Sequence, residues 1–261
     1  MKKIFVLIAT FLFISKAHAE NTSKHSSLVI DVNKLKVLHQ DNAKAQRYPA
    51  SLTKMMTLYL IFDALNTKKI TMDTKVRVSK EASLQKPCKL GLNPGETITV
   101  REIINGLIVK SANDAAFAIA EKLGGGSVEK FVRMMNQKAK RLGMKNTHFI
   151  NPHGWHDSRQ QTTAYDMAKL AISLRKYHPQ YYKLFSTKSF KFRGKTLKNH
   201  NKLLFKCNHV DGIKTGFTNP SGFNLVTSVK DKKSNIVAVV MGGTSAQERD
   251  QKMIHLINRF S

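Results

Sequence analysis

The sequence has few acidic residues, few cysteines and no internal repeat. Its 17 Asp and Glu stand against 44 Lys and Arg, so the 261-residue chain has a formal net charge of +27. The small numbers of Cys (two) and Pro (six) exclude a disulfide-stapled miniprotein and a collagen-like chain. With 41% apolar residues, the chain is not intrinsically disordered either. The composition therefore indicates a basic globular protein of one or two domains.

The first residues have the pattern of a secretory signal peptide. Lys2 and Lys3 precede an apolar stretch over residues 4–14, and Ala17-His18-Ala19 is a small-x-small cleavage site. This stretch is shorter than the roughly 20 residues that span a bilayer, and no other apolar run in the sequence reaches that length. We therefore expect residues 1–19 to be a signal peptide and the remaining chain to be exported, soluble in the periplasm or cell envelope.

The positive charge has two interpretations. Removing residues 1–19 takes away three Lys and no acidic residue, so the net charge remains about +24 (27 − 3). Strongly basic chains often bind nucleic acid, but export leaves membrane surfaces and anionic envelope polymers as the polyanions within reach. The alternative is a Lys-rich solvated surface, because the Lys residues are spread along the whole chain. We expect no nucleic-acid partner.

Apolar patterns place strands at both ends of the chain. Residues 28–32 are β-branched and apolar, and residues 36–40 can pair with them as a hairpin around Asn33. Residues 222–230 and 235–242 are two Val-rich runs that indicate a second antiparallel hairpin.

Helical patterns fill the middle of the chain. The segment after Pro49 is apolar on almost every side from residue 52 to 65, which indicates a buried helix. Residues 76–95 are expected to form loop and a short strand. Further helices are expected over residues 100–123 (one or two helices, with 111–114 as an internal N-cap), 127–142, 163–177 and 246–260. These patterns predict an α+β fold: one mainly antiparallel sheet from both chain ends, covered by helices, with an inserted helical lobe.

Three short motifs combine hydroxyl, amine and amide groups. They are Ser51-Leu52-Thr53-Lys54, Ser111-Ala112-Asn113 and Lys214-Thr215-Gly216. Ser51 and Lys54 are three residues apart at the start of a helix, so the amine can reach the hydroxyl. A Lys can activate a Ser only if its pKa falls, and an apolar helix with a nearby cation such as Lys214 would lower it. Taken alone, Ser51 would be a plain helix N-cap and Lys54 a surface residue.

The third motif suits an edge strand beside a ligand. Gly216 lets a ligand backbone approach closely, while Lys214 and Thr215 offer a cation and a hydroxyl to a carboxylate. Together, Ser-x-x-Lys, Ser-x-Asn and Lys-Thr-Gly form the signature of serine β-lactamases and penicillin-binding proteins.

From about residue 27 to 260 the sequence resembles the low-molecular-mass penicillin-binding proteins, the serine-type D-alanyl-D-alanine carboxypeptidases of the peptidase S11 type. The resemblance rests on residues 49–57, 110–115, 151–168, 211–225 and 241–243. It implies a β-lactamase/transpeptidase-like fold. It also implies that residues 20–261 form a single catalytic domain, without the C-terminal β-rich domain and amphipathic anchor of larger members.

The resemblance assigns three catalytic residues. Ser51 would be the acylated nucleophile, Lys54 its base, and Ser111 a proton relay towards the leaving amine. The backbone N–H groups of Ser51 and Phe217 would form the oxyanion hole. Phe217 stands where close relatives often carry His, which affects specificity more than chemistry because a backbone N–H does not depend on the side chain.

The resemblance also assigns the substrate-binding residues. Asn113 would hold the substrate amide, and Lys214, Thr215 and Arg249 would bind the terminal carboxylate, with Gly216 on the same strand. Arg249 is placed only by its spacing from the last strand. No metal and no cofactor are implied, and His153 with its neighbours lacks the three-ligand spacing of a zinc site.

The implied function is hydrolysis of the terminal D-Ala–D-Ala bond of peptidoglycan stem peptides, which limits cross-linking, with β-lactams as covalent inhibitors. The alternative is an endopeptidase that cuts D-Ala cross-links, since single-domain members often do so. A β-lactamase is less favoured, because no glutamate near residues 146–166 stands ready to activate water. A non-catalytic envelope-binding protein is a fourth hypothesis, against which the intact motifs argue.

Two cysteines remain outside these assignments. Cys88 lies in a loop over residues 80–91 that is expected to border the site and is atypical of the family there. The sequence leaves open whether Cys88 and Cys207 form a disulfide or remain separate thiols.

Overall fold

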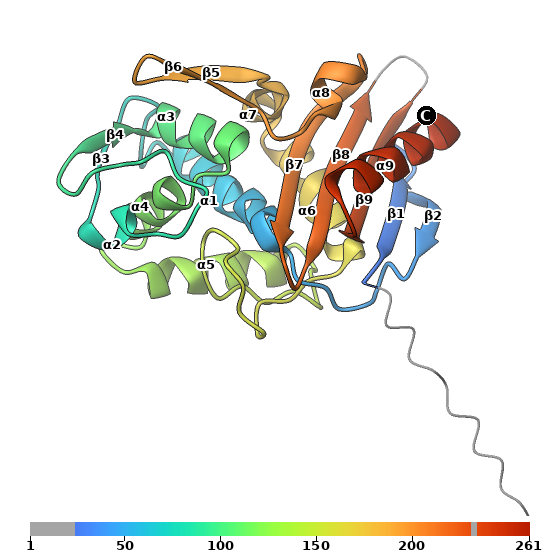
Figure 1. Cartoon of the computed structure of the whole chain (residues 1–261). Helices are drawn as coiled ribbons and strands as arrows, with labels where there is room; N and C mark the ends of the chain where they lie inside the picture. The colour runs from blue at the N-terminus through green and yellow to red at the C-terminus, as the bar shows by residue number, and fades with distance from the viewer. Residues whose placement is uncertain (1–23, 231–233) are drawn as a thin grey trace, which may run out of the picture.

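A computed structural model of the chain describes residues 24–230 and 234–261 (Figure 1). The expected signal peptide lies outside the described residues. Figure 1 shows a sheet with a helix on each face and a helical lobe beside it. The predicted α+β architecture is therefore confirmed.

The main sheet has five antiparallel strands in the order β2-β1-β9-β8-β7. The first strand pairs with the last, Ser26 facing Met241 and Asp31 facing Ile236. Both predicted hairpins are present, and β7 is the edge strand that carries the third motif. The strands are β1 (Ser26–Asp31), β2 (Lys36–Asp41), β7 (Val210–Thr218), β8 (Gly222–Lys230) and β9 (Asn235–Gly243).

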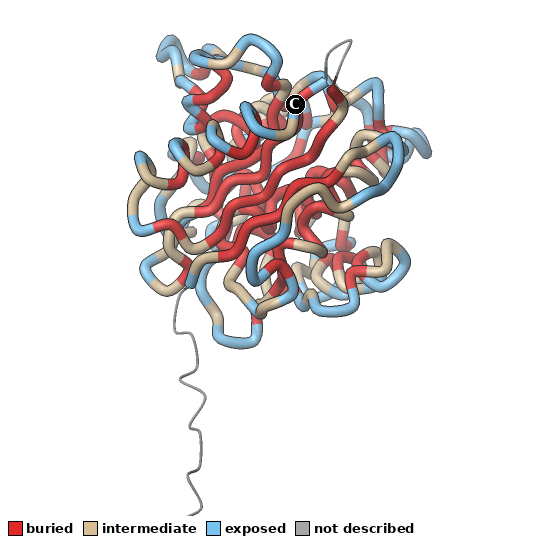
Figure 2. Tube along the Cα trace, turned by 90° about the vertical axis from the view of Figure 1, so that its right-hand side faces the viewer, coloured by how far each residue is buried: buried red, intermediate tan, exposed pale blue. Residues whose placement is uncertain are grey.

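Both faces of the sheet are buried, which explains the continuous apolar run over residues 236–241 of the central strand β9. Along β9, Val237 and Val239 face one core, which includes α6 (Ala164–Tyr177). Ala238 and Val240 face a second core under α9 (Ala246–Phe260), in keeping with the two-residue period of a strand. Figure 2 shows the central strands buried along most of their length, whereas the edge strand β2 is intermediate or exposed.

The helical lobe is organised around α1 (Lys54–Asn66), which follows a 3₁₀ turn, η1 (Ala50–Thr53). Met55, Met56, Thr57 and Leu58 are consecutive and fully buried, and consecutive residues point about 100° apart around a helix, so the predicted buried helix is confirmed. The rest of the lobe is β3 (Lys75–Arg77), α2 (Lys80–Ser83), β4 (Thr97–Thr99), α3 (Val100–Asn105), η2 (Gly106–Lys110), α4 (Asn113–Leu123) and α5 (Val128–Arg141). Between α6 and β7 lie α7 (Pro179–Tyr182), η3 (Lys183–Ser186), β5 (Ser189–Phe192), β6 (Lys195–Lys198) and α8 (Leu203–Lys206).

The predicted internal N-cap within residues 111–114 is confirmed: Ala112 is the N-cap of α4, without a side-chain bond, and Ser111 before it has a left-handed backbone (φ 60°). The π-helical turn η2 ends the first helix and turns Ser111 out of the helical path. The prediction of only loop and strand over residues 76–95 is wrong, because these residues contain the short helix α2, whose Ser79 cap accepts a hydrogen bond from the Ala82 N–H.

Within the described ranges, no helix combines the length and the apolar character needed to cross a membrane.

Candidate active site

Ser51 and Lys54 lie side by side where the 3₁₀ turn η1 runs into α1. The Lys54 amine donates to Ser51 Oγ at 3.1 Å, to Asn113 Oδ1 at 2.7 Å and to the His153 carbonyl at 2.5 Å. Ala50, just before Ser51, is held in the left-handed region at φ 48°. Strained backbone of this kind is often found at functional sites.

Lys54 is completely buried, and none of its hydrogen-bond partners is a carboxylate. Burial, and next the positive charge of Lys214, holds the pKa of Lys54 well below its usual 10.5. The lowered pKa favours the neutral amine, the form that can accept the Ser51 proton. The predicted effect of Lys214 on Lys54 is confirmed in direction.

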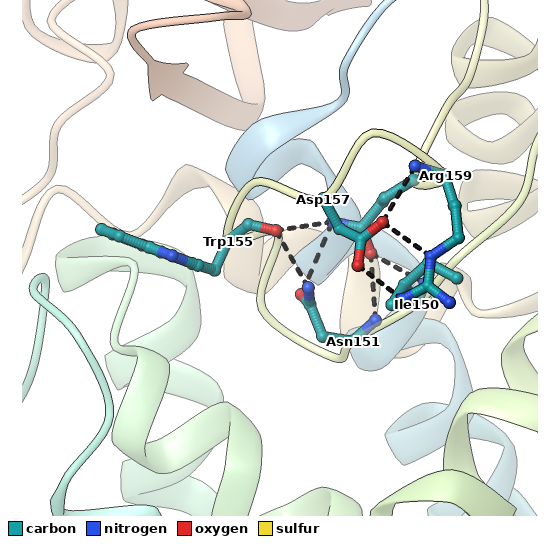
Figure 3. A network of polar contacts seen from close by, with 6 residues as sticks. Ile150, Asn151, Trp155, Asp157 and Arg159 are labelled. Atoms are coloured by element: carbon teal, nitrogen blue, oxygen red, sulfur yellow. Dashed lines mark hydrogen bonds and ion pairs between the residues drawn. The ribbon is translucent and has the colours of Figure 1, made fainter.

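The loop over residues 150–160 forms the wall beside Lys54, and a polar network fixes it (Figure 3). Asn151 and Gln160 both donate from their side-chain amides to the Trp155 carbonyl, at 2.9 and 3.2 Å. Arg159 forms a two-pronged pair with Asp157 at 3.0 and 2.7 Å. In Figure 3 the indole of Trp155 projects away from the rest of this network.

His153 contributes its backbone carbonyl to Lys54 rather than a ring nitrogen. Burial, and then the charge of Lys54, lowers the pKa of His153 to about 3, so the imidazole stays neutral. Its Nδ1 accepts from the Trp155 N–H at 3.1 Å, and Thr57 Oγ1 ties the preceding Pro152 carbonyl to α1 at 2.6 Å. These bonds position the acceptor of the lysine.

Ser111 and Asn113 approach Lys54 from the lobe. Ser111 Oγ is buried and, among the described residues, has no hydrogen-bond partner, so it is free for a proton relay. Asn113 accepts from Lys54, while its amide N–H groups donate to the carbonyls of Lys86 and Pro87 at 2.9 and 3.1 Å. Asn113 therefore links the lysine to the loop that borders the site.

Lys214, Thr215 and Gly216 lie on β7 beside the nucleophile turn. Lys214 is buried, its amine donates to the Thr215 carbonyl at 2.8 Å, and burial lowers its pKa to about 7, with the charge of Arg249 acting in the same direction. A Cβ on Gly216 would lie 3.2 Å from the Ser51 N and 3.0 Å from the Pro49 O. The close approach of this segment is a reason for the glycine in addition to the expected approach of a ligand.

A cleft of about 890 Å³ opens over these residues. Six of the predicted site residues line it: Ser51, Ser111, Thr215, Gly216, Phe217 and Arg249. Lys54, Asn113 and Lys214 lie directly beneath, so the structure brings all nine together. Arg249 is buried on α9 and pairs with Asp250 at 2.7 Å.

The lining of the cleft, in the described part of the chain, is basic and holds no Asp or Glu. Partial burial, followed by the charges of the surrounding Lys and Arg residues, lowers the pKa of His200 in this lining to about 4. Cys88 also lines the cleft; both Cys88 and Cys207 are free thiols. Such a lining suits a ligand that carries negative charge.

The sequence did not reveal Trp155 or the His153 carbonyl as parts of the site. One signal was present: a glycine precedes an aromatic residue in both Gly154-Trp155 and Gly216-Phe217. A glycine with close backbone neighbours often marks a place where two segments must touch.

Replacement of Gly154 is expected to test that contact. A Cβ on Gly154 would overlap the Ala50 carbonyl oxygen and lie 2.9 Å from the Ser51 N, and the residue has φ +90°. We expect Gly154→Ala to lower the free energy of unfolding by roughly 2–4 kcal/mol in urea titrations. The control is Gly125→Ala, where φ is +67° with open space around the Cβ; only strain of roughly 1–2 kcal/mol is expected. Equal losses would show that Gly154 is not crowded.

The two buried lysines are expected to make stability depend on pH. Between about pH 7 and 10 the unfolded chain keeps a proton on Lys214 that the folded chain has released, so the free energy of unfolding rises with pH. Lys54 acts in the same direction. The free energy of unfolding, measured by denaturant titration at several pH values, should rise less steeply with pH for Lys214→Met than for wild type. The exposed control Lys34→Met should behave like wild type. An unchanged slope would contradict the buried, neutral Lys214.

A helix-borne serine with a buried lysine, a Ser-x-Asn turn and a Lys-Thr-Gly edge strand define the β-lactamase/transpeptidase-like class of α+β proteins. The chain belongs to the D-alanyl-D-alanine carboxypeptidase family, peptidase S11, whose family model matches residues 14–245.

Three known proteins illustrate the relationship. D-alanyl-D-alanine carboxypeptidase DacD of Escherichia coli is 39% identical over 239 residues, which cover 89% of this chain and 61% of that protein. Penicillin binding protein 5 from Haemophilus influenzae superimposes with a TM-score of 0.86 at 34% identity, covering 90% of this chain and 70% of that chain. Penicillin-binding protein D2 from Listeria monocytogenes, in its cefotaxime-bound form, has a TM-score of 0.81 at 27% identity, covering 89% and 95%. The chain spans about three fifths of the length of the first curated relatives.

Proposed function

We propose that the protein is a serine-type D-alanyl-D-alanine carboxypeptidase, which hydrolyses the terminal D-Ala–D-Ala bond of peptidoglycan stem peptides through an acyl-enzyme on Ser51. The observation that carries the proposal is the buried Lys54 amine, 3.1 Å from Ser51 Oγ, with a lowered pKa. The names of the curated relatives support the same activity.

In the proposed reaction, Lys54 takes the proton of Ser51 as Oγ attacks the carbonyl of the penultimate D-Ala. The C–N bond then breaks, and the proton reaches the leaving amine through Ser111. Water hydrolyses the ester and restores Ser51. The backbone N–H groups of Ser51 and Phe217 would stabilise the developing oxyanion, a contribution of roughly 3–4 kcal/mol for such a donor.

The terminal carboxylate of the substrate would orient the peptide relative to Ser51. Lys214, Thr215 and Arg249 would bind it, and the absence of acidic residues from the described cleft lining fits an anionic chain end. Asn113 would hold the substrate amide through a rearrangement of its present bonds to Lys86 and Pro87. β-Lactams would acylate the same serine, in line with the cefotaxime-bound relative.

The alternatives receive less support. The curated relatives carry carboxypeptidase names, which does not favour an endopeptidase. In the 146–166 region, Asp157 is paired with Arg159, and Asp166 accepts from the Asn146 N–H and Thr147 Oγ1. Neither carboxylate is free to activate water, so rapid β-lactam hydrolysis is not expected. A protein with the proposed activity would act outside the cytoplasm, where its charge would favour anionic envelope polymers.

The direct test is D-Ala release from a synthetic pentapeptide ending in D-Ala-D-Ala. Release by the purified protein supports a carboxypeptidase. Cleavage of a cross-linked dimer without release from the pentapeptide would replace the proposal with an endopeptidase. No reaction with either substrate, combined with retained salt-sensitive binding to anionic polymer, would indicate a non-catalytic role.

A further inference from the structure

One extra residue interrupts the pairing of β7 with β8 where β7 begins. Val210 pairs with Val229, and the next pair along the two strands is Gly212 with Ser228. Two residues of β7 are thus passed for one residue of β8, so Asp211 is the additional residue of a β-bulge. In Figure 1, β7 is the edge strand nearest the helical lobe. The bulge therefore lies directly before the Lys-Thr-Gly motif of the candidate active site.

The bulge decides which face of the sheet Lys214 points to. Residues four apart share a face in a regular strand, and Val210 lies with Val229 in the core under α9. Lys214, however, pairs with Val226, which belongs to the core on the other face, and directly paired residues point to the same side of a sheet. Without the extra residue, Lys214 would face the core under α9, away from Lys54.

Side-chain contacts hold Asp211 in the bulge. The Ser228 hydroxyl donates to Asp211 Oδ1, and Arg175 Nη2 lies 3.9 Å from Asp211 Oδ2. The hydroxyl oxygens of Ser228 and Tyr182 are 2.5 Å apart, and Tyr182 is the donor because Ser228 has only one proton to give. Ser228 and Tyr182 are buried, where an unpaired polar group would be costly. These contacts from α6, α7 and β8 therefore favour one position of the Asp211 carboxylate.

Asp211 does not lie in the cleft lining of the described chain, so it can act on a ligand only through its strand. The strand is anchored again directly after the bulge, where the buried Asn201 donates from its side-chain amide to the Gly212 carbonyl at 3.2 Å. A shift at Asp211 would therefore be passed along β7 to the motif rather than absorbed at a free chain end.

We propose that Asp211 is a positioning residue, which through its hydrogen bond with Ser228 holds the bulge that turns Lys214 towards the cleft, and so sets the preference for a ligand carboxylate. The inference rests on the proposed function, in which Lys214 binds the terminal carboxylate of the substrate.

Acylation by benzylpenicillin and by its methyl ester tests the inference, because the two reagents differ only in the carboxylate that Lys214 would bind. We expect wild type to react faster with the free acid. The ratio of the two second-order rate constants should fall roughly 10- to 100-fold in Asp211→Ala, since a small misplacement of a binding group can cost that much. Asp211→Asn should keep most of the ratio, because its amide oxygen still accepts from Ser228. Ser228→Ala should lower the ratio as Asp211→Ala does, and the double variant should lower it no further.

The matched control is Asp63→Ala on α1. The Asp63 side chain is 35% exposed, against 34% for Asp211, and it pairs with Lys138 at 2.7 Å and with His178 at 3.3 Å. Its removal also deletes a partly buried carboxylate and its ion pairs, so it reproduces a general loss of stability. We expect Asp63→Ala to keep the wild-type ratio of acid to ester.

An unchanged ratio in folded Asp211→Ala, or an equal fall in Asp63→Ala, would overturn the inference. If Asp211→Ala does not fold, Ser228→Ala decides by the same criterion. Equal acylation of wild type by acid and ester would remove the carboxylate role of Lys214 and overturn the inference, although Ser51 would still be acylated. Absence of an acyl-enzyme with either reagent in wild type would refute the proposed function and this inference with it, so the two failures are distinguishable.

Discussion

Ser51→Ala is expected to abolish both D-Ala release and covalent labelling by benzylpenicillin. The substitution removes the only atom that can form the acyl bond in the proposed mechanism, and loss of a nucleophile costs roughly 10⁴–10⁶-fold in kcat. The backbone should not change, because the Ser51 side chain has a single hydrogen bond in the site, to Lys54. Mass spectrometry after incubation with the β-lactam measures labelling directly.

The control for this variant is Ser83→Ala, a serine of α2 whose hydroxyl bonds only to the Lys80 carbonyl. It should keep full labelling, and both variants should melt cooperatively near the wild-type temperature. A covalent adduct of unchanged yield in Ser51→Ala would show that another residue is the nucleophile. Cys88, a free thiol in the same cleft, would then be the first residue to examine.

Lys54→Met is expected to slow acylation by roughly 10²–10⁴-fold, the usual contribution of a general base. Methionine has a similar length and fills the buried space without an amine. Two opposing effects act on stability: the Asn113 and His153 oxygens lose a donor, and the cost of burying an amine disappears. We therefore expect a folded protein with an unchanged Ser51 and a slow reaction.

Rates of benzylpenicillin labelling, followed with thermal melts, test the lysine. Lys68→Met, at an exposed lysine after α1, serves as the control and should react like wild type. A cooperative melt together with a wild-type acylation rate in Lys54→Met would exclude the lysine as the base.

The architecture of the fold could be predicted because its signals are local. Apolar runs marked β1, β8 and β9, and helical patterns marked the helices over residues 127–142, 163–177 and 246–260. The prediction of one sheet built from both chain ends is confirmed by the pairing of β1 with β9.

The π-helical turn before Ser111 could not be predicted in this way. Its sequence, Gly106–Lys110, is as apolar as the helix that precedes it, and helix periodicity does not distinguish the two. Only contacts far apart in sequence place η2 where the left-handed Ser111 faces the cleft.

The site was predictable in its residue types and less so in its contacts. The three motifs identified Ser51, Lys54 and Lys214, and the structure places them together. One of the three acceptors of the Lys54 amine is a backbone carbonyl, which any residue at position 153 would supply. Main-chain groups leave no mark in a sequence, so this contact required the fold.

The pairing of β1 with β9 has a consequence for how the molecule is made. Ser51 lies close behind the first strand pair, while Lys214 and Arg249 come from the last part of the chain. Contacts between such distant segments form late and slow the folding of a domain. A nascent chain therefore carries a complete nucleophile helix long before it has a complete catalytic centre, and no partly synthesised molecule can be active. For a protein expected to be exported, the proposed active site therefore stays incomplete until both ends of the chain have met.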